Sequence, residues 1–271
     1  MNPIITDIAM TWDLSLPGTH LVTFDQIDST NLAAKRLAAR GAAHLTLVLA
    51  KEQTAGRGRL GRRWTSPAGN VYWSMILRPT AGWPTLGTLP FVSALSVKKC
   101  LDRLTEGRTN FSIKWPNDVL CDGRKISGIL HESEGAGQSG QSASIVVGIG
   151  INVDHYPTTD VLYPTTSLRN EGYEIGRDAV ITELTRIYID ILLRWISSGY
   201  PAIRDDLTKS MLGIGQRIAV RKGIDPAQHR SGIFKGLDDN GHLILETSLG
   251  EEERVAVGDV FLTGSSDPKA S

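Results

Sequence analysis

The run Ile145–Val153, with the sequence IVVGIGINV, constrains the fold of this chain more than any other stretch. It is nearly all apolar, yet much shorter than the roughly 20 residues that a membrane-spanning helix needs. Such a run is typical of a strand that is buried on both faces or lies in the centre of a sheet. Gly148 and Gly150 within it let another part of the molecule approach the backbone closely. Asn152, near its end, can hydrogen-bond broadly, so we expect it where the strand reaches a site or a turn.

The rest of the chain predicts a domain of strands and helices followed by a small β-rich unit. Strands are expected at His20–Phe24, Leu45–Ala50, Asn70–Leu77 and Phe111–Trp115, and helices at Leu32–Ala39, Leu86–Leu104, Asp178–Ile196 and Pro201–Met211. Short alternating segments separated by glycine turns follow at Gln216–Arg221, Arg230–Leu237, His242–Thr247 and Glu251–Val257. The sequence therefore predicts a main domain over residues 1–211 and a small antiparallel barrel over residues 212–271. The tail Ser265–Ser271 is expected to be disordered, and the Gly- and Ser-rich stretch within Glu132–Ser144 to form a flexible hairpin loop.

Composition argues against several classes of protein. Lys and Arg together number 29, as do Asp and Glu, so the net charge is zero and gives no general attraction to nucleic acid or to an anionic membrane. The two cysteines, Cys100 and Cys121, are too few for a disulfide framework and suit a reducing cytoplasm. No signal peptide or membrane span is predicted. The stretch before His20 is too short for a helix-turn-helix domain.

The segment Lys51–Trp64, KEQTAGRGRLGRRW, combines glycines with closely spaced arginines. Glycine loses more backbone entropy on ordering than any other residue, so we expect this segment to be mobile when no ligand is bound. Arginine guanidinium groups match the geometry of phosphate and carboxylate oxygens. The segment therefore predicts a loop that closes over an anion. An ordinary solvated surface loop is the alternative.

The same segment contains the G-x-G-x-x-G pattern of dinucleotide-binding folds, at Gly56, Gly58 and Gly61. That pattern needs a helix directly after it and an acidic residue about 20 positions later. The following residues have no helical periodicity and include Pro67, and no Asp or Glu occurs between Glu52 and Asp102. The sequence therefore argues against a dehydrogenase.

Two polar corners leave alternatives open. Ser29, Thr30 and Asn31 precede a helix, where they can cap it or can bind a small polar head group. In Lys114–Leu120, KWPNDVL, Pro116 breaks the strand, so Asn117 and Asp118 can hold a magnesium ion or a nucleotide hydroxyl, or can form an Asx-turn. Lys125 follows a turn at Asp122-Gly123, and a solvated side chain is the simplest interpretation for it.

Together these motifs resemble the biotin protein ligases, also called biotin-[acetyl-CoA-carboxylase] ligases. The resemblance rests on Ser29-Thr30-Asn31, on Gln53 with GRGRLGRRW (56–64), on KWPNDV (114–119) with Lys125-Ile126-Ser127-Gly128, and on GIGINV (148–153), in the family's order and spacing. It covers residues 20–264 and is similar to the short form that lacks an N-terminal DNA-binding domain. It implies an α+β fold with a mixed central sheet and packed helices, as in class II aminoacyl-tRNA synthetases, and an SH3-like C-terminal domain.

The resemblance also implies a chemistry and a set of site residues. Biotin and ATP give biotinyl-5′-AMP, and biotin then passes to a lysine of a biotin carboxyl carrier protein of acetyl-CoA carboxylase. The implied biotin ligands are Ser29, Thr30, Asn31, Gln53, Gly56, Arg57, Gly58, Arg59 and Lys125. The implied ATP or adenylate ligands are Arg59, Arg62, Trp64, Asn117, Asp118, Lys125 and Asn152, with Trp64 over the adenine and Mg²⁺ at Asn117 and Asp118. Lys125, Arg57 and Arg59 are the implied catalytic residues, and Asp118 is a hypothetical proton acceptor for the carrier lysine.

Further expectations concern partners and rival functions. The resemblance implies no DNA binding, and relatives that dimerise through a sheet edge make a homodimer a hypothesis. Lipoate ligases and octanoyl transferases share the fold class and acyl chemistry, but their glycine and arginine patterns differ and they lack KWPND. A nucleic-acid-binding module would need an extended basic face with aromatic platforms, which a neutral chain with one short basic loop does not supply.

Overall fold

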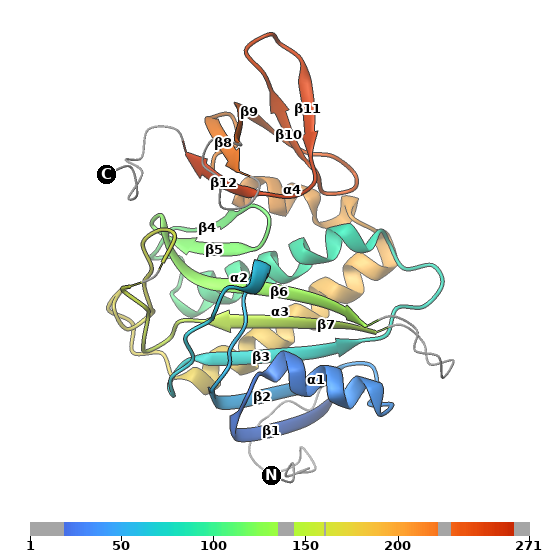
Figure 1. Cartoon of the computed structure of the whole chain (residues 1–271), viewed down its shortest axis with the longest axis vertical. Helices are drawn as coiled ribbons and strands as arrows, with labels where there is room; N and C mark the ends of the chain where they lie inside the picture. Colours follow the sequence, from blue (N-terminus) through green and yellow to red (C-terminus); the bar gives the residue numbers. More distant parts are fainter. Residues whose placement is uncertain (1–18, 135–143, 160, 222–228, 263–271) are drawn as a thin grey trace.

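The computed structural model describes residues 19–134, 144–159, 161–221 and 229–262, so the expected hairpin loop and the expected disordered tail fall outside the described residues. A seven-stranded mixed sheet, in the order β1-β2-β3-β7-β6-β5-β4, forms the centre of the molecule (Figure 1). Its strands are β1 (His20–Ile27), β2 (Thr46–Gln53), β3 (Val71–Leu77), β4 (Phe111–Lys114), β5 (Asp118–Cys121), β6 (Arg124–Glu134) and β7 (Ser144–Ile151). Only β1 and β2 pair in parallel, and all other neighbours are antiparallel. The apolar run IVVGIGINV supplies β7, the middle strand, as predicted.

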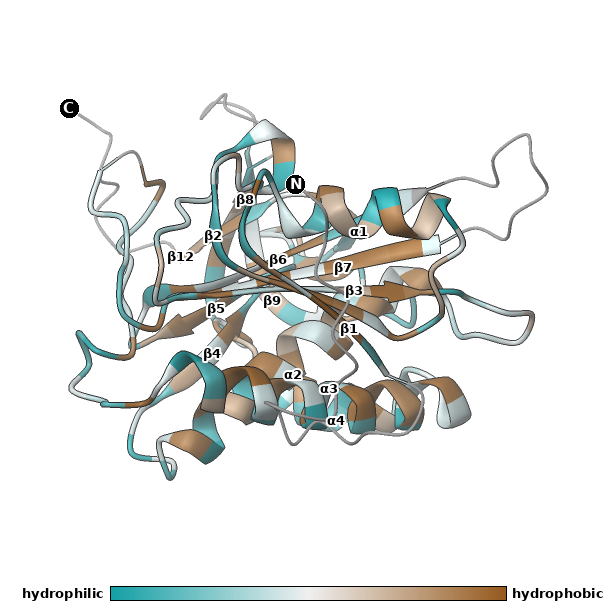
Figure 2. Cartoon of the chain, turned by 90° about the horizontal axis from the view of Figure 1, so that it is seen from below, coloured by the Kyte–Doolittle hydropathy of each residue, from teal (hydrophilic) through white to brown (hydrophobic). Residues whose placement is uncertain are grey.

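Helices cover both faces of this sheet unequally. Helix α1 (Thr30–Ala39) lies on one face, and α2 (Leu89–Leu104), α3 (Arg177–Ser198) and α4 (Pro201–Ser210) lie on the other (Figure 2). All four helices were predicted to within a few residues. The start of α2 is later than expected, because Pro90 lies in its first turn and Leu86–Thr88 form a separate 3₁₀ turn.

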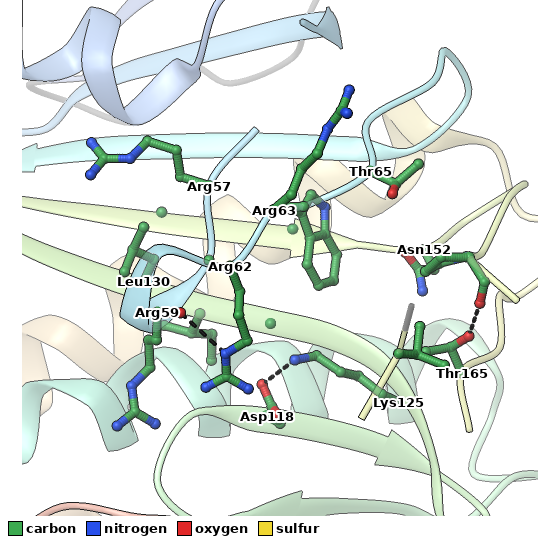
Figure 3. A pocket seen from close by; sticks show the side chains of 18 of the residues that line it. Arg57, Arg59, Arg62, Arg63, Thr65, Asp118, Lys125, Leu130, Asn152 and Thr165 are labelled. Carbon is green, nitrogen blue, oxygen red and sulfur yellow. Dashed lines mark hydrogen bonds and ion pairs between the residues drawn. The ribbon is translucent and has the colours of Figure 1, made fainter. Parts of the chain in front are cut away.

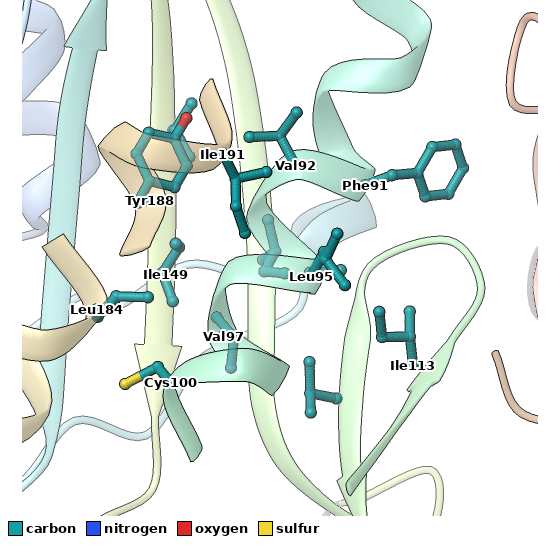
Figure 4. Close-up of a cluster of buried hydrophobic side chains, with 14 of the residues drawn as sticks. Phe91, Val92, Leu95, Val97, Cys100, Ile113, Ile149, Leu184, Tyr188 and Ile191 are labelled. Carbon is teal, nitrogen blue, oxygen red and sulfur yellow. The ribbon is translucent and has the colours of Figure 1, made fainter. Parts of the chain in front are cut away.

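Side-chain alternation along the strands sends neighbouring residues to opposite faces. Trp73 and Ile149 join the large core against α2 and α3, and Figure 4 shows Ile149 among side chains of these helices. Trp73 Nε1 donates to Thr185 Oγ1 at 2.9 Å. Ile76 and Val146 point the other way and pack against α1 in a smaller cluster. Most of the hydrophobic core therefore lies on the side of α2 and α3. On the α1 side the core is smaller, and part of the sheet surface there is not covered by it.

A second sheet follows the main one. It is antiparallel, in the order β11-β10-β9-β8-β12, and consists of β8 (Arg217–Arg221), β9 (His229–Leu237), β10 (Leu243–Glu246), β11 (Glu252–Val255) and β12 (Asp259–Leu262). Four of these strands were predicted, and β12 was missed. Trp115 Nε1 donates to the Gly241 carbonyl at 3.2 Å, so the second sheet is fixed to the first. Among the described residues, no helix combines the length and apolarity needed to cross a membrane.

Candidate functional site

A pocket of about 750 Å³ opens on the α1 side of the central sheet, a size typical of small-molecule sites. Nearly all the predicted site residues line it: Ser29, Thr30, Asn31, Gln53, Arg57, Gly58, Arg59, Arg62, Trp64, Asn117, Asp118, Lys125 and Asn152. Gly56 does not line the pocket but is buried beside it, where an added Cβ would lie 2.4 Å from both Trp64 O and Ser66 Oγ. Segments far apart in the sequence therefore meet at one cavity.

The floor of the pocket is made of glycines on neighbouring strands. Gly128 of β6 pairs with Gly150 of β7, and Gly148 lies two residues along β7. An added Cβ would lie 2.1 Å from Asn31 Oδ1 at Gly148 and 2.6 Å from the Trp64 ring at Gly150. The expectation that these glycines allow a close approach is confirmed, and the groups that approach are the Asn31 amide and the Trp64 indole.

At one end of the pocket, the Ser29-Thr30-Asn31 segment forms a corner of buried polar groups. Thr30 donates to Gln53 Oε1 from its backbone nitrogen at 2.8 Å and from its hydroxyl at 3.1 Å. Ser29 is the N-cap residue of α1 but makes no capping hydrogen bond with its side chain. The capping interpretation is therefore wrong for these side chains. We call Ser29, Thr30, Asn31 and Gln53 the polar corner.

Two serines support the polar corner and were missed by the sequence analysis. Gln53 Nε2 donates to Ser66 Oγ at 2.8 Å, and Ser66 Oγ donates to the Trp64 carbonyl at 2.9 Å. Ser74 Oγ lies 2.6 Å from Asn31 Oδ1 and 2.8 Å from Thr30 Oγ1. A signal for Ser74 existed, because a serine inside the otherwise apolar, fully buried strand β3 needs a hydrogen-bond partner.

At the other end of the pocket, Lys125 and Asp118 form a partly buried ion pair. Lys125 Nζ lies 2.7 Å from Asp118 Oδ1, and the two side chains are only 19% and 9% exposed (Figure 3). The amine also lies 5.5 Å from the ring centroid of Trp64 and 5.7 Å from that of Tyr163. Tyr163 donates its hydroxyl to the second oxygen of Asp118. The solvated interpretation of Lys125 is therefore wrong, and we call Lys125, Asp118 and Tyr163 the charged corner.

The segment around Tyr163 holds Lys125 in place. Lys125 N donates to Pro164 O at 2.8 Å, and Thr166 N donates back to Lys125 O at 2.9 Å. Asn152 Nδ2 donates to Thr166 O at 2.9 Å, while Asn152 Oδ1 is buried and has no hydrogen-bond partner among the described residues. This segment carries no pattern from which its role was predictable. Asn152 thus anchors this segment, and its role as a nucleotide ligand stays a prediction.

Three arginines of the glycine-rich loop contact different parts of the molecule. Arg57 Nη1 lies 3.1 Å from Glu132 Oε1, and Figure 3 shows its side chain directed away from Lys125. Arg59 Nη1 donates to Asn117 Oδ1 at 2.6 Å. Arg62 Nη2 lies 3.3 Å from Asp259 Oδ2, on strand β12 of the second sheet. In this structure the three predicted anion ligands are thus each held by an oxygen of the protein.

The corner after Pro116 was a candidate for an Asx-turn or a magnesium site. Asn117 Nδ2 donates across to Ile129 O at 2.8 Å and Asp118 pairs with Lys125, so neither side chain caps its own backbone. Their oxygens are of the type that magnesium prefers. Asn117 Oδ1 contacts Arg59, Asp118 Oδ1 contacts Lys125, and the second oxygen of Asp118 accepts from the Tyr163 hydroxyl, so the pair fits a magnesium ion only if some of these partners move. Magnesium at this corner stays a prediction.

A mixed sheet whose pocket joins a polar corner to a charged corner defines an enzyme-like site for a small ligand that bears an anion. Comparison with known proteins makes this specific. Residues 23–152 match the biotin/lipoate A/B protein ligase family, and residues 213–263 match the biotin protein ligase C-terminal domain. The chain belongs to the biotin protein ligases of this family.

Relatives along most of the chain support this assignment. The biotin--[acetyl-CoA-carboxylase] ligase of Paracoccus denitrificans is 36% identical over 88% of this chain and 98% of its own length. The bifunctional ligase/repressor BirA of Bacillus subtilis is 34% identical over 86% of this chain and 71% of its own length. The structure of the biotin protein ligase from Aquifex aeolicus in complex with biotin and ATP matches with a TM-score of 0.74 and 30% identity, covering 89% of this chain and 97% of that one.

Proposed function

We propose that this protein is a biotin-[acetyl-CoA-carboxylase] ligase. It activates biotin with ATP to biotinyl-5′-AMP and pyrophosphate, and then transfers biotin to a lysine of a carrier protein. The observation that carries the proposal is the single pocket that joins the polar corner to the charged corner. The relative from Paracoccus denitrificans that carries this name and the Aquifex aeolicus structure with biotin and ATP both support it.

The polar corner suits the ureido ring of biotin, which offers two N–H donors and one carbonyl acceptor. A polar group of this ring left unpaired in a dry pocket would cost about 1 to 3 kcal/mol. Ser29, Thr30 and Asn31 are all nearly fully buried, so a ligand that reaches them must exchange its water for protein hydrogen bonds. The hydroxyls and amides of this corner are the proposed partners.

The charged corner suits the reacting end of the ligand. The biotin carboxylate must attack the α-phosphorus of ATP, forming a C–O–P anhydride while the bond to pyrophosphate breaks. Two anionic groups repel each other as they approach, and Lys125 is the proposed residue that offsets this repulsion. Its contribution is large because its side chain is mostly shielded from water. Arg57, Arg59 and Arg62 are proposed to exchange their present oxygen partners for ligand oxygens.

In the second step the carrier amine attacks the acyl carbon, an amide forms and AMP leaves with the electrons of the C–O bond. The attacking amine must lose a proton, and Asp118 is the proposed acceptor because it is a carboxylate that lines the pocket beside Lys125. Trp64 is proposed to cover the adenine, and magnesium is proposed to enter with the phosphates of ATP.

The remaining proposals concern organisation and partners. We propose a catalytic domain over residues 1–211 and a small domain over residues 212–271, because the break between α4 and β8 separates the two sheets. The proposed carrier is the biotin carboxyl carrier protein of acetyl-CoA carboxylase, and the proposed location is the cytoplasm. A homodimer through an outer strand of the central sheet is tested by light scattering with biotin and ATP present, and an unchanged monomer mass would reject it.

The test of the activity is exchange of labelled pyrophosphate into ATP, with biotin, lipoate, octanoate or no acid present. Exchange with biotin alone is the expected result, and it would establish adenylation and acid specificity together. Exchange with lipoate or octanoate instead would keep the mechanism and overturn the substrate. No exchange with any acid would overturn the proposed activity.

A further inference from the structure

Glu132 of β6 connects the polar corner to the glycine-rich loop, although it does not itself line the pocket. Its Oε2 accepts a hydrogen bond from Asn31 Nδ2 at 3.0 Å. Its Oε1 lies 3.1 Å from Arg57 Nη1 and 3.7 Å from Lys35 Nζ. The side chain is only 15% exposed. One carboxylate thus contacts side chains of α1, namely Asn31 and Lys35, and Arg57 of the glycine-rich loop.

The carboxylate fixes the orientation of the Asn31 amide. An ionised carboxylate only accepts hydrogen bonds, so the NH₂ group of Asn31 must face it and the amide oxygen must face the other way. That oxygen lies 2.6 Å from Ser74 Oγ and directly over Gly148, which lines the pocket. Ser74 has a single hydroxyl proton to give, so the Asn31 oxygen keeps capacity to accept a further hydrogen bond. The polar corner therefore presents an acceptor at this point.

We propose that Glu132 is a positioning residue that makes the site selective for a ligand head group bearing N–H donors, by holding the Asn31 oxygen toward the pocket. This inference rests on the proposed biotin ligase function. The ureido ring of biotin has two N–H groups, whereas the dithiolane ring of lipoate and the end of octanoate have none. An acid without such a donor leaves the remaining acceptor capacity of the Asn31 oxygen unused in a closed pocket, because Ser74 satisfies only one of its lone pairs, and the binding of that acid is penalised accordingly.

The ion pair with Arg57 extends this role to the loop. Arg57 pairs with the oxygen of Glu132 that Asn31 does not use, so both contacts exist at the same time. The loop that carries Arg57 also carries Trp64, whose ring rests over the glycine floor. Glu132 therefore holds the first arginine of the loop next to the head-group site, and loop placement and head-group recognition share one side chain.

The test measures binding by calorimetry of biotin and of an analogue in which oxygen replaces one ureido N–H. The wild-type protein is expected to bind biotin more tightly than the analogue. The Glu132→Gln variant is expected to bind biotin at least about 10-fold more weakly, because a glutamine amide can turn either end toward Asn31. The affinity for the analogue should fall less than the affinity for biotin, so the difference in affinity between the two ligands becomes smaller in the variant.

The control is Glu183→Gln on α3. Glu183 is 17% exposed and pairs with Arg186 at 2.6 Å and Arg103 at 3.2 Å, so it matches Glu132 in burial and in having two basic partners. It is expected to leave both affinities unchanged. If wild-type protein does not bind biotin, the proposed function fails. If wild-type protein binds biotin but Glu132→Gln keeps its affinity, or loses both ligands equally, the positioning role is overturned.

Two further tests add to the single variant, and the second of them does not use the Glu132→Gln substitution. The Asn31→Asp change places two carboxylates face to face, and adding Glu132→Gln should recover part of the lost biotin affinity, since a glutamine amide can donate to the new carboxylate. Biotin should protect the loop from trypsin less well in the Arg57→Gln variant than in the wild-type protein. The difference in affinity between biotin and the analogue should stay the same in this variant. The inference would be contradicted if the double variant bound biotin no more tightly than Asn31→Asp alone. It would also be contradicted if Arg57→Gln bound biotin and the analogue with equal affinity.

Discussion

Lys125 is the side chain on which the proposed chemistry depends most directly. Its amine is placed by an ion pair with Asp118 and by two flanking aromatic rings, while its backbone is held on both sides by the 164–166 segment. A lysine so constrained has lost its conformational freedom before the ligand arrives. In the proposed mechanism its charge therefore acts on the reacting carboxylate without a further entropic cost.

We expect Lys125→Gln to lower the rate of pyrophosphate exchange about 100-fold, because the change removes the charge that offsets carboxylate–phosphate repulsion. Biotin affinity measured without ATP should change much less. Lys99→Gln, which removes a half-buried lysine paired with Asp206 on the helical side, is the control. Exchange at the wild-type rate in Lys125→Gln would remove the lysine from the mechanism.

Asp118 is expected to matter mainly in the second step. Asp118→Asn keeps the size of the side chain but removes a proton acceptor, so transfer from preformed biotinyl-5′-AMP to the carrier should slow by roughly 100-fold. A single-turnover assay with isolated adenylate separates this step from activation. Transfer at the normal rate would show that another group takes the proton.

At the scale of the elements, the pocket depends on β6 and β7 carrying glycine where the sheet would otherwise carry side chains. Gly148→Ala would place a methyl group 2.1 Å from Asn31 Oδ1 and must displace the amide. We expect biotin affinity to fall about 10-fold or more, with a loss of stability of about 1 to 3 kcal/mol. Calorimetry and urea unfolding measure the two effects.

Gly176→Ala provides the control for this change, since an added Cβ there meets nothing within 4 Å. It should leave biotin affinity as it is. Equal effects of the two substitutions on biotin binding would mean that the glycine floor has no role in recognition.

Sequence reasoning predicted most elements because apolar periodicity is a local property. β7 was recognised from nine consecutive letters, and α3 from its apolar stripe. Most of the site residues that it named line one pocket, but they were named through motifs whose meaning comes from a resemblance. The partners of those residues were not predictable. The motif residues Arg57, Gln53 and Asp118 contact Glu132, Ser66 and Tyr163 through tertiary structure, and the spacing of residues in the sequence does not indicate such contacts.

At the scale of the whole molecule, strand β12 of the second sheet contacts the site residue Arg62 and the nearby Lys114. Asp259 pairs with Arg62 at 3.3 Å. Phe261 lies near the amine of Lys114, which is 4.9 Å from its ring centroid and 3.4 Å from that of Tyr163. Lys114 is buried, and this burial lowers its pKa to about 8. The junction between the two sheets therefore contains an amine that is easily deprotonated.

This amine gives the stability of the protein a specific pH dependence. Between pH 8 and the ordinary lysine pKa of 10.5, the folded protein has released the Lys114 proton while the unfolded chain still binds it, so stability rises with pH in this window. The destabilisation due to the buried charge is fully present below pH 8. Lys114→Met removes this destabilisation. Below pH 8 it should therefore raise the free energy of unfolding, by at most about 1.4 kcal/mol for each unit by which the Lys114 pKa is lowered.

The measurement is urea unfolding of wild type and Lys114→Met from pH 7 to pH 10.5. The free energy of unfolding of the variant, relative to wild type, should be most favourable below pH 8 and should decline steadily above it. Lys235→Met, at an exposed lysine paired with Glu246, should show no such trend. Parallel curves for wild type and Lys114→Met would contradict the lowered pKa.

The alternation of side chains in β3 has a practical consequence for protein engineering. Trp73 and Met75 belong to the core, whereas Tyr72 and Ser74 face the α1 side, at or beside the pocket. Mutational libraries restricted to the second set would vary ligand preference while the side chains of the large core stay unchanged. Libraries restricted to the first set would tune thermal tolerance while leaving substrate choice alone. A single strand thus offers two separate design variables, interleaved residue by residue.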